Sequence, residues 1–121
     1  MVSCIVVDDN SDIVGVVCEL LEMIKVKVLA TGSDGLQAVE LYKKHSPDLI
    51  FVDLLMPRYD GFYAIGKIRE FDPNSKIVAV TSDLKADEYV QLNLLKPNYI
   101  LYKPFNTKEL IQVVLHVFSD V

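Results

Sequence analysis

The chain has 121 residues, a length that predicts a single domain. Hydrophobic residues make up 51% of the sequence, enough apolar material for a core that needs no metal or disulfide to hold it together. The chain has 17 acidic and 12 basic residues, and the net charge of −5 argues against general binding to nucleic acids or anionic membranes. Cations and proteins are the more suitable ligands.

The two cysteines, Cys4 and Cys18, both lie within apolar stretches, and we predict that they are small buried core residues and form no disulfide. The first residues contain no basic segment and no cleavage site of small residues, and the chain has no apolar run of about 18 residues. We therefore expect no membrane insertion and a reducing, cytoplasmic location.

Short apolar runs alternate along the chain with segments whose apolar residues recur at helical spacing. This pattern predicts strands over residues 4–7, 26–30, 48–52, 76–81 and 99–102, and helices over residues 13–24, 34–45, 62–72, 85–96 and 106–118. Asn10 or Ser11 is the expected N-cap of the first helix. Asp34 and Gln37 resemble a capping box at the start of the second.

Five strand–helix pairs in this length predict an α/β fold with a doubly wound, five-stranded parallel sheet and five helices. Parallel strands need crossover connections, and right-handed crossovers place the helices on both faces of the sheet. In sheets of this kind, ligands bind outside the carboxyl ends of the strands. The residues that end each strand are therefore the candidates for a functional site.

Polar residues follow four of the predicted strands: Asp8-Asp9, Asp53, Thr81-Ser82 and Lys103-Pro104. Three carboxylates at one sheet edge repel one another unless a cation lies among them, and oxygen ligands of this kind suit Mg²⁺. A metal ion, an ammonium group and a hydroxyl around one carboxylate would complement a phosphoryl group attached to it. Carboxylates act as nucleophiles in aspartyl-phosphate chemistry.

These motifs resemble those of a response-regulator receiver domain, the phospho-accepting module of two-component signalling. The matching segments are Asp8-Asp9, the stretch from Asp53 through Leu55, Pro57 and Asp60 to Gly61, then Thr81-Ser82 and Lys103-Pro104-Phe105. The resemblance covers essentially the whole chain, residues 1–121, as one receiver domain. It implies a flavodoxin-like topology with strand order 2-1-3-4-5.

The resemblance implies that Asp53 is the phosphorylated residue. It also implies that Asp9 is a direct Mg²⁺ ligand and that Asp8 acts on the metal directly or through water. Asp53 itself and the backbone carbonyl of Leu55 would complete the protein ligands.

The resemblance further implies roles for two residues that follow later strands. Thr81 would hydrogen-bond the phosphoryl group and shift on phosphorylation, and Lys103 would pair with a phosphoryl oxygen. The Lys103-Pro104 bond would be cis. Asp60-Gly61 is assigned to a turn or helix start and left out of the catalytic set.

The partners implied are a sensor histidine kinase or a histidine phosphotransfer protein as phosphoryl donor. A downstream protein target would bind the face formed by residues 85–96, 99–102 and the last helix, where Ile111 and Leu115 lie outside the main apolar stripe. Phosphorylation-dependent dimerisation is also open. The protein would catalyse its own Mg²⁺-dependent phosphorylation and dephosphorylation, without conventional turnover of a substrate.

Two other functions stay open from the sequence. One is a receiver-like scaffold that binds proteins without being phosphorylated, and the other is a Mg²⁺-dependent hydrolase or phosphotransferase of small molecules. A flavin-binding domain of similar topology is disfavoured, because Asp8-Asp9 would repel a bare phosphate.

The sequence departs from the receiver pattern at the turn before the fifth strand, where Pro97-Asn98 replaces the common Gly-Ala, and within that strand. Many receivers carry an aromatic switch residue three positions before the lysine, and here that position is Ile100. Tyr99 and Tyr102 flank it, but a one-residue offset turns a side chain to the opposite face of a strand. We therefore expect the usual aromatic switch to be altered.

Overall fold

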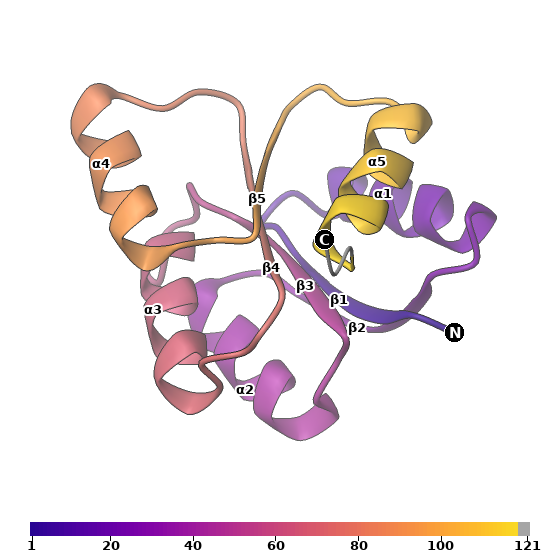
Figure 1. The fold of residues 1–121 in the computed structure, drawn as a ribbon, viewed down its shortest axis with the longest axis horizontal. Coiled ribbons are helices and arrows are strands. Elements are labelled where there is room, and N and C mark those ends of the chain that lie inside the picture. The colour runs from indigo at the N-terminus through magenta and orange to yellow at the C-terminus, as the bar shows by residue number, and fades with distance from the viewer. Residues whose placement is uncertain (119–121) are drawn as a thin grey trace.

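The computed structural model describes residues 1–118, which form a central parallel sheet with helices on both faces (Figure 1). The strands are β1 (Ser3–Val7), β2 (Lys27–Gly32), β3 (Leu49–Asp53), β4 (Ile77–Thr81) and β5 (Tyr99–Tyr102). The helices are α1 (Ser11–Met23), α2 (Gly35–His45), α3 (Gly61–Phe71), α4 (Ala86–Leu95) and α5 (Thr107–Val117). The strand order is β2-β1-β3-β4-β5, so the predicted fold class and order are confirmed.

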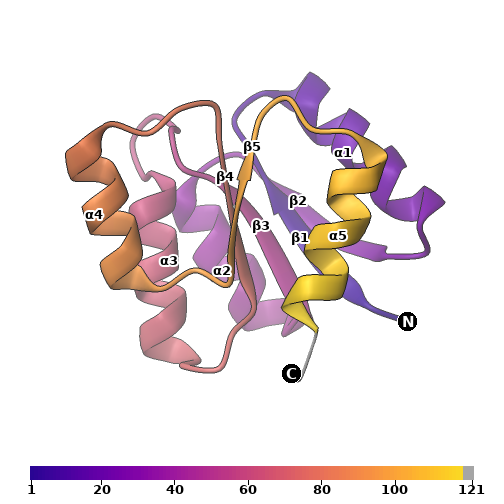
Figure 2. The ribbon, with the colours of Figure 1, turned by 45° about the horizontal axis from the view of Figure 1, so that its top comes forward.

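The sheet separates two hydrophobic clusters. Helices α1 and α5 cover one face, and α2, α3 and α4 cover the other (Figure 2). The central strands β3 and β4 are buried along their whole length, which explains why their sequences are continuous apolar runs. The sheet therefore places its strand ends, and the polar residues that follow them, on a rigid base.

Three strands begin one residue later than predicted, at Lys27, Leu49 and Ile77, and hydrogen bonds explain the first two differences. The backbone N–H of Val26 donates to the Leu21 carbonyl, so Val26 belongs to the turn after α1, and β2 begins at Lys27. The Asp48 carboxylate accepts hydrogen bonds from the backbone N–H and hydroxyl of Ser3 and lies outside β3. Val26 therefore bonds to the end of α1, and Asp48 bonds to the first residue of β1.

The helix starts agree with the expected caps. Asn10 caps α1 by accepting from the backbone N–H groups of Asp12 and Ile13. Asp34 caps α2 by accepting from the Gln37 N–H at 2.9 Å, but the Gln37 side chain bonds the N–H of Ser33 rather than that of Asp34. The capping box is thus half formed, with its second bond shifted by one residue.

The prediction for the cysteines holds in part. Cys4 is fully buried in β1, where burial, with the neighbouring Cys18, raises the pKa of its thiol to about 12, and Cys18 in α1 is half-buried. Both thiols are free. The expectation that Cys18 is a buried residue was wrong, because it lies at the edge of the apolar stripe of α1. Within residues 1–118, no helix has both the length and the apolar composition to cross a membrane.

A network of polar groups links α3 to the amino ends of β4 and β5. These strand ends lie opposite the carboxyl ends that carry the candidate site. Arg69 of α3 donates to the carbonyl and hydroxyl of Ser75, to the Lys96 carbonyl, and to the Asn98 side-chain oxygen at 2.9 Å. That same Asn98 oxygen accepts from the backbone N–H of Ile77 at 2.8 Å. The network joins the end of α3 to the turn between α4 and β5.

We predict that Asn98→Ala lowers the free energy of unfolding by about 1–3 kcal/mol, because it leaves the buried Ile77 N–H and an Arg69 donor without an acceptor. Urea denaturation measures the change. Asn93→Ala, at an exposed position within α4, is the matched control and should change stability by less than about 0.5 kcal/mol. Equal effects of the two substitutions would contradict this account.

Candidate functional site

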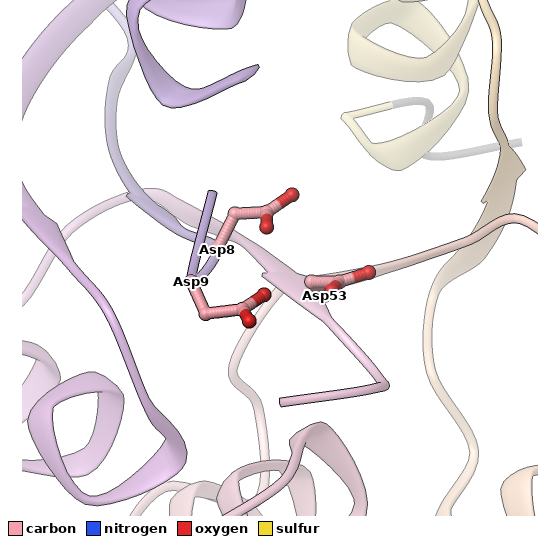
Figure 3. Close-up of side chains that lie close together, drawn as sticks. All are labelled: Asp8, Asp9 and Asp53. Atoms are coloured by element: carbon pink, nitrogen blue, oxygen red, sulfur yellow. The ribbon is translucent and has the colours of Figure 1, made fainter. Parts of the chain in front are cut away.

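Three carboxylates meet at the carboxyl ends of β1 and β3. Strand register pairs Val7 with Val52, so the residues that follow these two lie side by side at the carboxyl end of the sheet. Asp8, Asp9 and Asp53 each place a carboxylate oxygen within 4.8 Å of the others (Figure 3). Asp8 and Asp53 are buried and Asp9 is exposed. The predicted acidic cluster is therefore present, with one member open to solvent.

Lys103 provides the positive charge beside this cluster. Its ammonium lies 2.7 Å from an oxygen of Asp8 and 3.3 Å from an oxygen of Asp53. The peptide bond to Pro104 is cis, as expected from the resemblance. Burial alone would lower the pKa of Lys103, but its contacts with Asp8 and Asp53 outweigh burial and raise that pKa, so the ammonium stays charged.

Asp53 is held in an unfavourable environment for a carboxylate. Burial, followed by the negative charge of Asp8, raises the pKa of Asp53 to about 6, and Lys103 offsets only part of this. Asp8 is better compensated, because one of its oxygens accepts from Lys103 and the other from the Asn10 backbone N–H at 3.0 Å. Of the two buried carboxylates, Asp53 is therefore the less well compensated.

The chemistry of these ligands fits a hard divalent cation. Three carboxylates within reach of one another, one of them exposed, provide oxygen donors of the kind that Mg²⁺ takes while keeping several waters. A cation among them would relieve the repulsion that raises the pKa of Asp53. The loop after β3, residues 54–60, also borders Asp53, and its Leu55 side chain is exposed.

Thr81 lies at the end of β4, on the neighbouring strand, and is fully buried. Its hydroxyl donates to the backbone carbonyl of Asp83 at 2.9 Å, so in this structure it is engaged with the loop that leads to α4. The Thr81 carbonyl accepts from the Lys103 N–H at 2.8 Å. Thr81 thus connects the two strands that carry the edge of the site to the start of α4.

The contribution of Asn10 to the site was missed in the sequence beyond its role as a helix cap. Its backbone N–H orients Asp8, while its side chain caps α1. An aspartate followed two residues later by such an N–H is an Asx turn, and the string Asp8-Asp9-Asn10-Ser11 contains this signal. One residue therefore couples the position of the carboxylate to the start of the helix.

An apolar groove of about 320 Å³ opens beside the cluster, between α1 and the segment that follows β5. Its lining includes Ile13, Val16, Leu20 and Phe105, and it borders Lys103. Val16 is largely exposed within α1. The charged cluster thus has an apolar surface directly next to it.

The fold and the site together define a doubly wound α/β domain with an acidic cluster and a lysine at the carboxyl edge of the sheet. Residues 4–115 match the family model described as the response regulator receiver domain, and the chain belongs to this family.

Proteins with similar sequences and a similar solved structure support this assignment. The chemotaxis protein CheY of Treponema pallidum is 37% identical over 119 residues, which cover 95% of this chain and 81% of that protein. The protein CcdB of Bacillus subtilis is 31% identical over 98% of this chain and 99% of its own length. Among solved structures, the CheX–CheY–BeF3–Mg²⁺ complex of Borrelia burgdorferi matches with a TM-score of 0.92 at 25% identity, covering 98% of this chain and 90% of that one.

We predict that Asp53→Asn raises folding stability at pH 8 by on the order of 1 kcal/mol, and that the gain disappears towards pH 4. The folded chain holds the Asp53 proton more tightly than the unfolded chain, because the pKa rises from 3.8 to about 6. Ionisation of Asp53 should therefore lower the free energy of unfolding of the wild type as pH rises from about 3.8 to about 6. The asparagine variant cannot ionise at this position and should not show this decrease.

Urea denaturation across this pH range measures the difference, with Glu19→Gln on the exposed face of α1 as the control for loss of one negative charge. If the stability difference between Asp53→Asn and wild type did not change with pH, the assigned environment of Asp53 would be wrong.

Proposed function

We propose that Asp53 accepts a phosphoryl group from the phosphohistidine of a sensor histidine kinase or a histidine phosphotransfer protein. A carboxylate oxygen of Asp53 forms the new bond to phosphorus as the phosphorus–nitrogen bond to the donor imidazole breaks, and the imidazole leaves with the electron pair. The observation that carries this proposal is the placement of the buried Asp53 carboxylate at the end of β3, between Asp8, Asp9 and Lys103.

The ligands proposed for Mg²⁺ are Asp9, Asp53 and the backbone carbonyl of Leu55, with Asp8 acting directly or through water. When bound, Mg²⁺ supplies positive charge that offsets the repulsion between the carboxylates and an incoming phosphoryl group. Asp8 is bonded to Lys103 in this structure, which favours its action through water.

Lys103 and Thr81 are proposed to bind the transferred group. Lys103 already lies 3.3 Å from the acceptor and carries a full charge, so a small movement of its ammonium would pair it with a phosphoryl oxygen. The Thr81 hydroxyl would exchange the Asp83 carbonyl for the phosphoryl group. The transfer and later hydrolysis are steps of this chain on itself, and no conventional turnover of a separate substrate is proposed.

The donor protein is proposed to bury the apolar groove beside Lys103, because contact there would bring a phosphohistidine to the edge where Asp53 lies. A cytoplasmic location is part of the proposal, in keeping with the free thiols of Cys4 and Cys18. No nucleic-acid or membrane contact is proposed.

The output surface is proposed to be the face formed by α4, β5 and α5. Its exposed apolar side chains are Tyr89, Val90, Leu94, Tyr102, Ile111, Leu115 and Phe118. A downstream protein target, or a second copy of the domain after phosphorylation, would cover them. The link to the site runs through Thr81, whose bond to the Asp83 carbonyl holds the loop that enters α4.

The structure corrects one sequence interpretation about this face. Ile100 packs with the cluster under α3 and α4, whereas Tyr99 packs with the cluster under α5 and lies 5.2 Å from the ring of His116. Tyr102 is two residues from Ile100 and so points to the same side of β5, contrary to the prediction for both flanking tyrosines. Tyr102 also pairs with Thr81 in the sheet, so it is the tyrosine placed to respond to that residue.

Intact-mass measurement after incubation with acetyl phosphate tests the acceptor. We expect wild type to gain one phosphoryl group with Mg²⁺ and none with excess chelator, and Asp53→Asn to gain none. Asp60→Asn is the matched control, because asparagine also caps a helix and Asp60 serves α3 as its N-cap.

Label that persists in Asp53→Asn would identify a different acceptor. Absence of label in wild type that binds Mg²⁺ would leave either an acceptor that takes the group only from a kinase or a protein-binding scaffold, and a phosphorylated histidine kinase as donor separates the two. Release of many equivalents of phosphate from a small-molecule substrate would favour a hydrolase. Persistent label in Asp53→Asn, absence of label from every phosphohistidine donor, or such turnover would each contradict the proposed function.

We further predict that Thr81→Ala still takes up the phosphoryl group but loses most of the response of the output surface. Alanine has no hydroxyl to exchange between the Asp83 carbonyl and the phosphoryl group. Amide chemical shifts of α4, β5 and α5, measured before and after phosphorylation, report the response. Thr81→Ser keeps the hydroxyl and should keep the shift changes; full changes in Thr81→Ala would contradict the coupling.

A further inference from the structure

The loop of residues 54–60, between β3 and α3, has few bonds of its own. Its base is closed by the Gly61 N–H, which donates to the Leu54 carbonyl at 3.0 Å, and the side chains of Leu54 and Met56 are buried. Over residues 55–59 of the described chain, one backbone hydrogen bond is made, and it joins Tyr59 to α2. Buried side chains hold the first part of the loop, and a neighbour outside the loop holds its last part.

That neighbour is the first turn of α2. The Gly35 N–H donates to the Tyr59 carbonyl at 2.7 Å. Gly35 is the first residue of the helix, where an N–H has no partner within the helix, so this donor is available to bind another segment. The loop uses it to rest directly on the end of α2.

The contact requires a glycine because of space. A Cβ at Gly35 would lie 2.9 Å from the Tyr59 carbonyl oxygen and closer still to that of Asp60, and both are backbone atoms that cannot rotate away. Gly35 does not have a positive φ, so an alanine could adopt its backbone conformation. The close approach of the loop is thus the specific feature that a side chain would disturb.

A second contact holds the same loop to the same turn. Arg58 adopts a left-handed conformation with φ of 68°, and its guanidinium lies 3.6 Å from a carboxylate oxygen of Asp34. Asp34 is the buried N-cap of α2. The N-cap and the first residue of α2, Asp34 and Gly35, therefore contact two successive residues of the loop, Arg58 and Tyr59.

We propose that Asp34 and Gly35 are positioning residues for the metal site, because they fix the loop whose Leu55 carbonyl is a proposed ligand. This inference rests on the proposed Mg²⁺ site. Mg²⁺ demands near-ideal octahedral geometry with ligands at about 2.0–2.1 Å, so displacement of one ligand weakens binding. Loss of residues that orient metal ligands typically costs about 10–100-fold in affinity.

Titration of the isotopically labelled protein with MgCl₂, followed by amide chemical shifts, gives both the Mg²⁺ dissociation constant and evidence of folding. We expect Gly35→Ala to weaken Mg²⁺ binding about tenfold with the shifts of the sheet unchanged. The matched control is Gly15→Ala, where a Cβ meets nothing within 4 Å, and its affinity should stay within about twofold of wild type.

A folded Gly35→Ala protein with wild-type Mg²⁺ affinity would overturn the inference. Failure of the wild type to bind Mg²⁺ would instead count against the proposed metal site itself, so the two failures are distinguishable. A merely structural role for Gly35 would lower the melting temperature of the metal-free protein and leave the Mg²⁺ dissociation constant unchanged.

Should Gly35→Ala fail to fold, Arg58→Ala and Arg58→Gln decide the question. Both remove the same positive charge, so direct electrostatic effects on the cation cancel between them. Glutamine keeps an N–H donor and most of the side chain that extends towards Asp34, whereas alanine keeps neither. We expect Arg58→Ala to bind Mg²⁺ about twofold to threefold more weakly than Arg58→Gln; equal affinities would overturn the inference.

Discussion

Mutual repulsion among Asp8, Asp9 and Asp53, only partly offset by Lys103, is the interaction on which the rest of this structure depends. Buried carboxylates this close together are costly: burial first, and then the charge of Asp8, raise the pKa of Asp53 to about 6. The cost is tolerated because the groups sit at the ends of strands whose positions are fixed by two hydrophobic clusters. The rigid sheet thereby holds the three carboxylates close together, in a site that added positive charge would stabilise.

The two ends of the sheet serve different purposes. At the carboxyl edge, short polar contacts such as Asn10 to Asp8, Gly35 to Tyr59 and Thr81 to Asp83 set the loops around the acidic cluster. At the opposite edge, Arg69 and Asn98 fasten the end of α4 to the start of β5. Helix α4 is thus anchored at its carboxyl end, while its other end follows the loop held by Thr81. Under the proposed function, a change at Thr81 would act on α4 through the loop that enters the helix.

The sequence was sufficient to predict the fold and the membership of the acidic cluster. Apolar runs that end in Asp8-Asp9 and Asp53 can be recognised from the local sequence alone. A parallel sheet then places the carboxyl ends of these strands at the same end of the sheet, independently of how the side chains pack. Contacts that depend on a second segment were not predictable in this way. Nothing near Asn98 in the sequence indicates that Arg69 donates to it, and nothing near Gly35 indicates that the backbone of Tyr59 and Asp60 lies against it.

The direction of the Thr81 hydroxyl is a further example of this limit. The sequence places Thr81 at the end of β4, but the acceptor of its hydroxyl, the Asp83 carbonyl, depends on the path of the next loop. Likewise, the edge position of Cys18 follows from where α1 rests on the sheet, which helical periodicity defines only to within about a residue. The positions of the candidate functional residues were predictable from the sequence, but the hydrogen-bond partners of their side chains were not.

The central claim is that Asp53 carries negative charge against the cost of burial and of its acidic neighbours. The most direct test is a ¹³C NMR titration of the Asp53 carboxyl group, with and without Mg²⁺. The account predicts a pKa of about 6 in the absence of the metal and a clearly lower pKa in its presence, because a bound cation favours the charged form. A pKa near the ordinary value of 3.8 that does not respond to Mg²⁺ would contradict it.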